Sequence, residues 1–375
     1  MSGSRPGWTT RRRPPSVERA PGARAKPFRS RSRSPSSSLA RAQAARPVVQ
    51  CVSTGKRVPK KRALPVLGPC PVSRPLRFLP YGRQDRPDTF PREAGINAAA
   101  DIRPASPECA QPRAFGDARV RVMQDRDGIG RLQGLRQAGS LKLLFPRPVG
   151  RGIEVVAVNT AGGITGGDRF GIRAEAGAGT LLTVTTQAAE RAYRAQQDEV
   201  AAVENRVIAE AGAEVRWLPQ ETILFDRCAL RRRLRIDLAP DARLLAAEPL
   251  IFGRAAMGEV LRGIRFSDRF AIHRDGTPLY LDGIEIDGDA HALMMRRATG
   301  AGAGAMASLV HVAPGAGAHL DAVRDLVGAA GGASLLWPDV LVLRVLAADG
   351  FLLRRALLPV LDRLSGGSLP RVWRF

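Results

Sequence analysis

Hydrophobic and polar residues alternate along most of the chain after about residue 114, in short runs that are broken by turn-forming residues. Residues 180–186 read TLLTVTT, and Leu234 and Ile236 stand between charged neighbours. A period of two with many β-branched residues is typical of strands, and turns at intervals of about 8–12 residues are typical of an all-β sandwich, barrel or stacked-sheet core. Turns are predicted at 210–213, 239–242 and 274–277, the last with Asp275 and Gly276 as the centre of a hairpin.

Helical spacing of apolar residues is confined to short segments. Residues 188–195, 318–330 and 351–364 are the candidates, and the last is followed by Gly366 and Gly367 as a stop signal. The pattern therefore predicts an all-β fold with a few short helices, in a domain that covers residues 106–375.

The densest group of glycines follows the apolar run 155–158. Residues 159–170 read NTAGGITGGDRF, so four glycines are followed at once by a carboxylate. Glycine weakens regular structure, so such a cluster predicts a tight turn with close backbone approach. The spacing fits neither the Walker nor the dinucleotide-binding pattern, which excludes both kinds of nucleotide loop. The residues of this predicted structural loop are Gly162, Gly163, Gly166, Gly167 and Asp168.

Positive charge is concentrated at the N-terminus. Residues 1–118 hold 24 Lys and Arg against 7 Asp and Glu, out of a net charge of +23 for the chain. Such Arg-, Pro- and Ser-rich sequence buries too little apolar surface to fold, so residues 1–105 are predicted to be a disordered extension. A basic arm of this kind can bind nucleic acid through phosphates, but few aromatic residues are present for base stacking. The alternative is that translation starts downstream, because the chain has 53 Arg and only 5 Lys, as GC-rich codons read in frame would give.

Motifs for targeting and for common catalytic chemistry are absent from the sequence. No apolar stretch is long enough for a leader or a membrane span, and only Cys228 lies in the core region, so a cytoplasmic protein is expected. Gly-x-Ser-x-Gly, Cys-x-x-Cys and His-x-x-x-His do not occur. Cys228 is predicted to be a small buried residue and not a nucleophile, and His311 is predicted to be a packed or a surface histidine and not a ligand.

Carboxylates next to apolar runs are the remaining candidates for chemistry, because a buried acid needs water, an arginine or a metal. Ion pairs with the many arginines are the simplest interpretation. A hydrated path for a divalent cation is the second, and a hydrolase or isomerase that uses paired acids such as Asp168 and Glu248 is the third. The acids in question are Asp168, Glu221, Glu248, Glu259 and Asp282.

Five blocks in this order resemble the urease accessory protein D family, called UreD or UreH. The similarity extends from about residue 113 to the end of the chain. The blocks are NTAGGITGGDRF at 159–170, TTQAAERAYR at 185–194, WLPQETILFD at 217–226, FGRAAMGE at 252–259 and LPRVW at 369–373.

The resemblance implies a stacked-sheet, β-helix-like fold and a maturation chaperone that is not an enzyme. Such a chaperone binds apo-urease and the accessory proteins F and G, and Ni²⁺ passes through it in transit without a tightly bound cofactor. The residues that match candidate positions of the nickel path are Asp168, Glu248 and Asp282. For the interfaces, the C-terminal segment 337–375 offers Trp337, Trp373 and Phe375 as aromatic anchors. Membrane association is not expected, and nucleic-acid binding is the least favoured reading.

Overall fold

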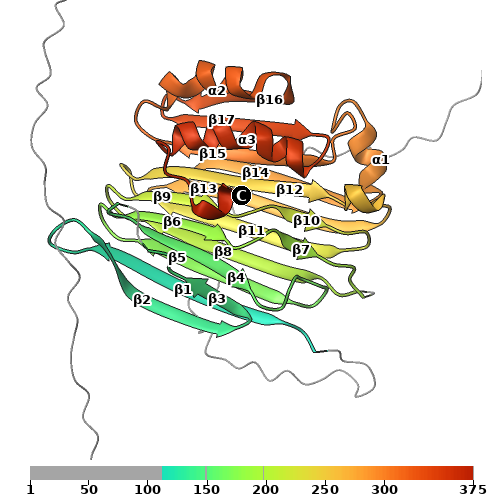
Figure 1. The fold of residues 1–375 in the computed structure, drawn as a ribbon, viewed down its shortest axis with the longest axis horizontal. Coiled ribbons are helices and arrows are strands. Elements are labelled where there is room, and N and C mark those ends of the chain that lie inside the picture. Colours follow the sequence, from blue (N-terminus) through green and yellow to red (C-terminus); the bar gives the residue numbers. More distant parts are fainter. Residues whose placement is uncertain (1–111, 148–149, 197, 375) are drawn as a thin grey trace, which may run out of the picture. The chain divides into compact units, whose positions relative to one another are not determined.

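The computed structural model describes residues 112–147, 150–196 and 198–374, which form two stacked β-sheets with a few short helices (Figure 1). The predicted all-β, stacked-sheet class is therefore confirmed. The predicted disordered extension, residues 1–105, lies outside the described residues. Among the described helices, none is long and apolar enough to cross a membrane.

One sheet has seven strands, in the order β14-β13-β11-β8-β5-β1-β2. Its strands are β1 (Phe115–Gln124), β2 (Gly130–Gly139), β5 (Arg169–Ala176), β8 (Ala201–Ala209), β11 (Ala229–Leu238), β13 (Ile264–Arg274) and β14 (Thr277–Gly288).

The second sheet has ten strands, eight of them in the order β16-β17-β15-β12-β9-β6-β4-β3, with β10 and β7 continuing from β12. Its strands are β3 (Leu141–Leu144), β4 (Ile153–Asn159), β6 (Leu181–Thr186), β7 (Glu190–Ala192), β9 (Glu214–Leu218), β10 (Thr222–Leu224), β12 (Arg243–Phe252), β15 (Ala305–Val312), β16 (Gly331–Trp337) and β17 (Val340–Ala347).

The chain winds between the two sheets like a coil. Strands β5, β8, β11 and β13 enter the first sheet in turn and pair in parallel, while β4, β6, β9 and β12 do the same in the second. The corners between the sheets are short and stack on one another: the amide of Gly179 donates to Ala211, and the amide of Gly212 donates to Asp241. The predicted turns at 210–213 and 239–242 are two of these corners.

Antiparallel strands close the coil at its ends. Strand β2 pairs with β1, β3 with β4, and β14 with β13. The β13–β14 hairpin turns at Asp275 and Gly276, both in the left-handed region with φ of 49° and 73°. This is the hairpin that the Asp-Gly pair predicts.

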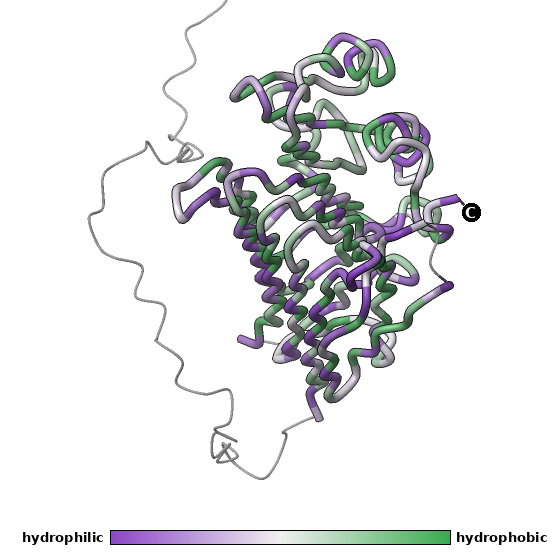
Figure 2. Tube along the Cα trace, turned by 90° about the vertical axis from the view of Figure 1, so that its left-hand side faces the viewer, coloured by the Kyte–Doolittle hydropathy of each residue, from purple (hydrophilic) through white to green (hydrophobic). Residues whose placement is uncertain are grey.

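Apolar side chains fill the space between the sheets and the underside of the C-terminal helices. Figure 2 shows hydrophobic and hydrophilic positions alternating along the strands. A first cluster joins the inner faces of both sheets, for example Leu182, Ile236 and Phe266. A second cluster lies beneath α2 (Leu320–Val327) and α3 (Gly350–Leu364), which pack against β15, β16 and β17. The short helix α1 (Ala290–Met295) instead packs against the first cluster through Ala290.

Two of the three helix predictions are confirmed and one is wrong. Helix α3 begins after Asp349, whose side chain accepts from the amide of Leu352 at 2.8 Å, and it is followed by Gly366 and Gly367 at positive φ. Helix α2 and its flanking 3-10 turns occupy 316–330. The segment 188–195 instead contains β7, because pairing with β10 and with Ile164 overrides its weak helical spacing.

The glycine-rich loop packs directly against β7. The amide of Ile164 donates to the carbonyl of Arg191, and the amide of Tyr193 donates back to Ile164. Gly163 has φ of +154°, and a Cβ there would lie 2.2 Å from the ring of Tyr193. Gly162 also has a positive φ but has open space around it. The loop is therefore the close-approach turn that its glycines predict.

Replacing Gly163 by alanine is expected to lower the free energy of unfolding by about 2–4 kcal/mol, from backbone strain together with overpacking. Gly162→Ala is the matched control, since it meets only the backbone strain of about 1–2 kcal/mol. Urea unfolding of both variants measures the difference. Equal losses would show that the contact with Tyr193 does not constrain the loop.

Candidate functional site

A cavity of about 370 Å³ lies between the two sheets, next to the glycine-rich loop. Strands β5, β8, β11 and β13 supply one wall, and β4, β6, β7, β9, β10 and β12 supply the other. Part of the lining is apolar, for example Ile172 and Val184. The polar lining comes mainly from Asn159, Gln187, Glu190, Asn205, Gln220, Thr222, Arg232, Glu248 and Asp268.

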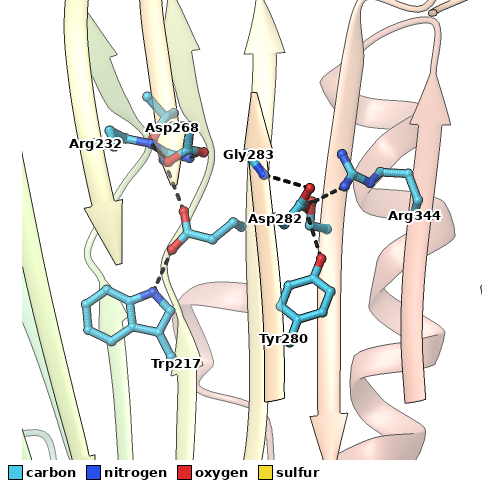
Figure 3. Close-up of polar contacts among 10 residues, drawn as sticks. Trp217, Arg232, Asp268, Tyr280, Asp282, Gly283 and Arg344 are labelled. Carbon is cyan, nitrogen blue, oxygen red and sulfur yellow. Dashed lines mark hydrogen bonds and ion pairs between the residues drawn. The ribbon is translucent and has the colours of Figure 1, made fainter. Parts of the chain in front are cut away.

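Three charged side chains from the two walls form a buried cluster (Figure 3). Arg232 from β11 bonds both carboxylate oxygens of Asp268 on the next strand, and its Nη1 lies 3.1 Å from Glu248 Oε2 across the sandwich. Trp217 completes the cluster by donating from its indole nitrogen to Glu248 Oε1 at 2.7 Å. Two carboxylates thus share one guanidinium, so with all three groups ionised the cluster carries one negative charge.

Burial dominates the protonation of this cluster. Burial raises the pKa of Glu248, and the neighbouring charge of Asp268 raises it further, against the lowering effect of Arg232. Burial alone would lower the pKa of Arg232, yet the charges of Asp268 and Glu248 raise it overall. The arginine therefore stays charged, and the pKa of Glu248 lies above that of an ordinary glutamate.

Glu190 is a third carboxylate in the cavity lining, on β7. Burial raises its pKa, against the lowering effect of a hydrogen bond from Asn159 Nδ2 to its Oε2 at 3.1 Å. Among the described residues it forms no ion pair. The charge of neighbouring Arg191 also lowers the pKa of Glu190, but it does so without an ion pair.

Asp168 holds the glycine-rich loop and does not line the cavity. It is buried, its Oδ1 accepts from the amide of Ala114 at 2.7 Å, and its Oδ2 accepts from the amide of Thr165 at 2.8 Å. Both oxygens are thus engaged by the backbone of the entry to β1 and of the loop itself. In this geometry Asp168 fixes the loop.

Asp282 ties β14 to the second sheet. Its Oδ2 accepts from Ser308 of β15 at 3.3 Å and forms an ion pair with Arg344 of β17, and Tyr280 donates to the same oxygen at 3.0 Å (Figure 3). It too is outside the cavity lining. Of the three acids predicted for a metal path, only Glu248 lines the cavity.

The other acids singled out in the sequence are paired with arginine. Glu221 lies 3.1 Å from Arg354, and Glu259 lies 2.9 Å from Arg254. Asp168 and Glu248 bond different partners, and no group of three or more His, Cys, Asp or Glu residues in the described ranges is arranged to hold a metal ion. The ion-pair interpretation therefore holds for most of these acids.

Cys228 is packed as its sequence context predicts, and of the two positions left open for His311 the structure shows the packed one. Cys228 is buried, and burial raises the pKa of its thiol to about 12, which leaves almost no thiolate near neutral pH. His311 is buried with Nδ1 3.1 Å from the carbonyl oxygen of Leu244, and burial lowers its pKa to about 4.

The predicted aromatic anchors differ in exposure. Trp337 is 56% exposed at the end of β16, next to Leu336, which is 48% exposed. Trp373 is fully buried in the C-terminal cluster, so the prediction that it presents its ring to a partner is wrong. Its indole nitrogen donates to the carbonyl of Leu218, which anchors the chain end to the core. Phe375 lies outside the described residues.

Arg232, Asp268 and Glu190 are site residues that the sequence interpretation missed. A signal exists for the first two: Arg232 is in phase with Leu230 and Leu234, and Asp268 is in phase with Phe266 and Phe270, so both must point inward. Glu190 carries no such signal, because its strand has only three residues.

Comparison with known proteins decides the family. The model of the UreD urease accessory protein family matches residues 115–374. The chain belongs to the UreD family. It is similar to the urease accessory protein UreD of Roseobacter denitrificans, with 51% identity over 266 residues that cover 70% of this chain and 96% of the relative. The UreD protein of Ruegeria sp. is 50% identical over 300 residues, covering 76% and 100%, and that of Rhizobium etli is 47% identical over 249 residues, covering 66% and 90%.

The UreD match begins with β1 and ends just after the last 3-10 turn (Arg371–Trp373), so it spans both sheets and the C-terminal helices. The resemblance predicted from the five sequence blocks is confirmed. UreD membership gives the chain an accessory role in urease maturation.

Proposed function

We propose that this chain is a non-catalytic chaperone that binds apo-urease together with accessory proteins F and G and lets Ni²⁺ pass through its interior in the cytoplasm. The observation that carries the proposal is the carboxylate-lined cavity between the sheets of a UreD-family chain. Glu190, Glu248 and Asp268 face a space of about 370 Å³, large enough for a hydrated cation.

The charge of the wall suits a cation in transit. Arg232 neutralises one of the two acids that it bonds, and Glu190 has no ion pair among the described residues. Nickel accepts oxygen ligands, but sites built from nitrogen and sulfur hold it more tightly. A wall that offers chiefly carboxylate and amide oxygens therefore favours entry without strong retention.

The binding partners require surfaces outside the cavity. Trp337 and Leu336 at the exposed end of β16 are the aromatic and apolar anchors that we assign to a protein interface. Asp168 and Asp282 remain candidates for positions that a nickel ion passes, although each is already bonded to its own partners.

Replacing Glu190 by glutamine is expected to lower the nickel content of urease by about tenfold, a loss typical of removing one metal-supporting side chain. Stability should not fall. Burial raises the pKa of this acid in the folded protein, so its charged form opposes folding above the unfolded pKa, and the neutral amide relieves that cost. The measurement is the nickel content of urease matured with purified F, G and this chain.

Glu154→Gln is the matched control, because burial also raises the pKa of Glu154 but its side chain does not line the cavity. We expect this control to mature urease normally, and both variants to bind apo-urease. Unchanged nickel transfer by Glu190→Gln and by Glu248→Gln together would refute passage through this cavity. Unchanged maturation when the whole chain is omitted would refute the chaperone role.

A further inference from the structure

The outward face of the seven-stranded sheet is rich in arginine. Along each strand the buried residues point to the other sheet, and the alternate positions point away from it. On the five central strands these outward positions carry ten arginines and four acids, an excess of six positive charges. The arginines are Arg119, Arg121, Arg169, Arg173, Arg206, Arg231, Arg233, Arg235, Arg265 and Arg269, and the acids are Asp117, Glu175, Glu204 and Asp237.

Strand register places five arginines in one row across five neighbouring strands. The successive partners are Arg136, Arg119, Arg173, Arg206 and Arg235. With neighbouring strands about 4.8 Å apart, the row is about 19 Å long. Like charges directly opposite each other destabilise a sheet, so sheet stability does not explain this row.

Acids in the adjacent rows neutralise one end of the face. Asp117 lies between Arg119 and Arg136, Glu175 between Arg121 and Arg173, and Asp237 between Arg206 and Arg235. Each of these carboxylates thus serves two arginines.

At the other end of the face, acids on the neighbouring strands lie opposite arginines without forming ion pairs with them: Glu204 is the register partner of Arg233, and Asp287 is that of Arg265. Arg231 and Arg233 on β11, with Arg265 and Arg269 on the neighbouring strand β13, are exposed and form no ion pair with any described residue. We call these four side chains the arginine patch. Arg233 and Arg269 are direct partners in the register, so the patch is continuous across both strands.

Because the four arginines form no ion pair with any described residue, they are available to bond the carboxylates of an acidic occupant. The chain's own N-terminal segment cannot serve, because residues 1–118 carry 24 Lys and Arg against 7 Asp and Glu. A second copy that presented the same face would be repelled by it. A polynucleotide is disfavoured because the carboxylates of Glu204, Glu175 and Asp237 interrupt the face and would repel phosphates.

We infer that the arginine patch is a docking surface for an acidic face of a protein partner. Arginine forms bidentate bonds with carboxylates, and alternating acids on the same face discriminate in favour of a partner that also carries basic residues. The inference rests on the proposed function for its first candidates, which are apo-urease and the F and G proteins. The contact surface is the arginine side chains of the patch, and strands β11 and β13 provide it.

The test uses the full chain with Arg231, Arg233, Arg265 and Arg269 all replaced by glutamate. A matched control reverses four arginines of the N-terminal segment, Arg11, Arg12, Arg13 and Arg29. Biolayer interferometry measures binding to purified apo-urease, F, G and poly-L-glutamate, and to duplex DNA and anionic phospholipid vesicles, between about 50 and 200 mM salt. Circular dichroism checks that each variant is folded.

We expect one of the three proteins to bind the patch variant at least about tenfold more weakly, chiefly through slower association, and the control variant to bind it like the wild type. Equal binding of all three proteins by both variants overturns the inference, as does a loss confined to DNA or vesicles. If the wild type binds none of the three proteins, the proposed function fails. Poly-L-glutamate then decides the inference, which stands only if the patch variant alone loses affinity for it.

Discussion

Replacing Arg232 by methionine is expected to lower the free energy of unfolding by about 3–5 kcal/mol, because it leaves two buried carboxylates without their counter-charge. Arg232 bonds Asp268, Glu248 and the hydroxyl of Thr222 at 2.8 Å, and all of these residues are buried. Methionine keeps the apolar part of the side chain, so the loss reports charge more than volume. Chemical unfolding monitored by tryptophan fluorescence measures it.

A rescue variant separates charge from packing. Adding Glu248→Gln and Asp268→Asn to Arg232→Met removes the uncompensated charges, and at least half of the lost stability should return. If the triple variant is no more stable than Arg232→Met, the cluster is held by packing and this reading is wrong.

The loss should also depend on pH. Burial already raises the pKa of Glu248 above its ordinary value, and without Arg232 this pKa rises further. The folded state then binds more protons than the unfolded state between the two pKa values, so stability falls as pH rises through that window. Arg232→Met should therefore be closer to the wild type at about pH 5 than at about pH 8.

Replacing Trp373 by alanine is expected to cost about 3–5 kcal/mol, the usual range for truncating a buried aromatic residue. The ring is fully buried, its Nε1 donates to the carbonyl of Leu218 at 2.9 Å, and the guanidinium of Arg354 lies 4.9 Å from the ring centroid. For a domain of this size such a loss lowers the melting temperature by roughly 6–20 °C, which calorimetry resolves.

Two further variants make the result specific. Trp373→Phe keeps most of the packing but loses the hydrogen bond, so it should fall between the wild type and alanine. Trp337→Ala removes a ring that is 56% exposed and should change stability by less than about 0.5 kcal/mol. If Trp337→Ala and Trp373→Ala cost the same, the burial of the C-terminal tryptophan does not stabilise the fold.

Local sequence signals predicted the turns of the fold well, because each of these turns depends on residue types that are specific to turns. The Asp275–Gly276 hairpin, the corners at 210–213 and 239–242, and the stop after α3 each depend on turn residues alone. The prediction of a helix at 188–195 failed because the conformation of this segment is decided by pairing with Ile164 and β10, which are distant in sequence. Local propensity carries no information about such partners.

The site was less predictable than the fold. Asp168, Glu248 and Asp282 each lie beside an apolar run in the sequence, yet their partners differ. Asp168 bonds backbone amides, and Glu248 bonds an arginine and a tryptophan. Asp282 bonds an arginine and a tyrosine. Those partners come from other strands, so register had to be known first. The row of five arginines likewise follows from pairing between strands and not from any one segment.

The antiparallel strands at the ends of the coil have a consequence for solubility. A stack of parallel strands exposes, at each end, backbone groups that can recruit another chain and grow into a fibre. Here β2 and β14 terminate one sheet and β3 and β16 terminate the other, each running against its neighbour. A second chain that presented another parallel coil would meet a strand that runs in the opposite direction, so the parallel stacking of strands could not continue unbroken from one chain into the next.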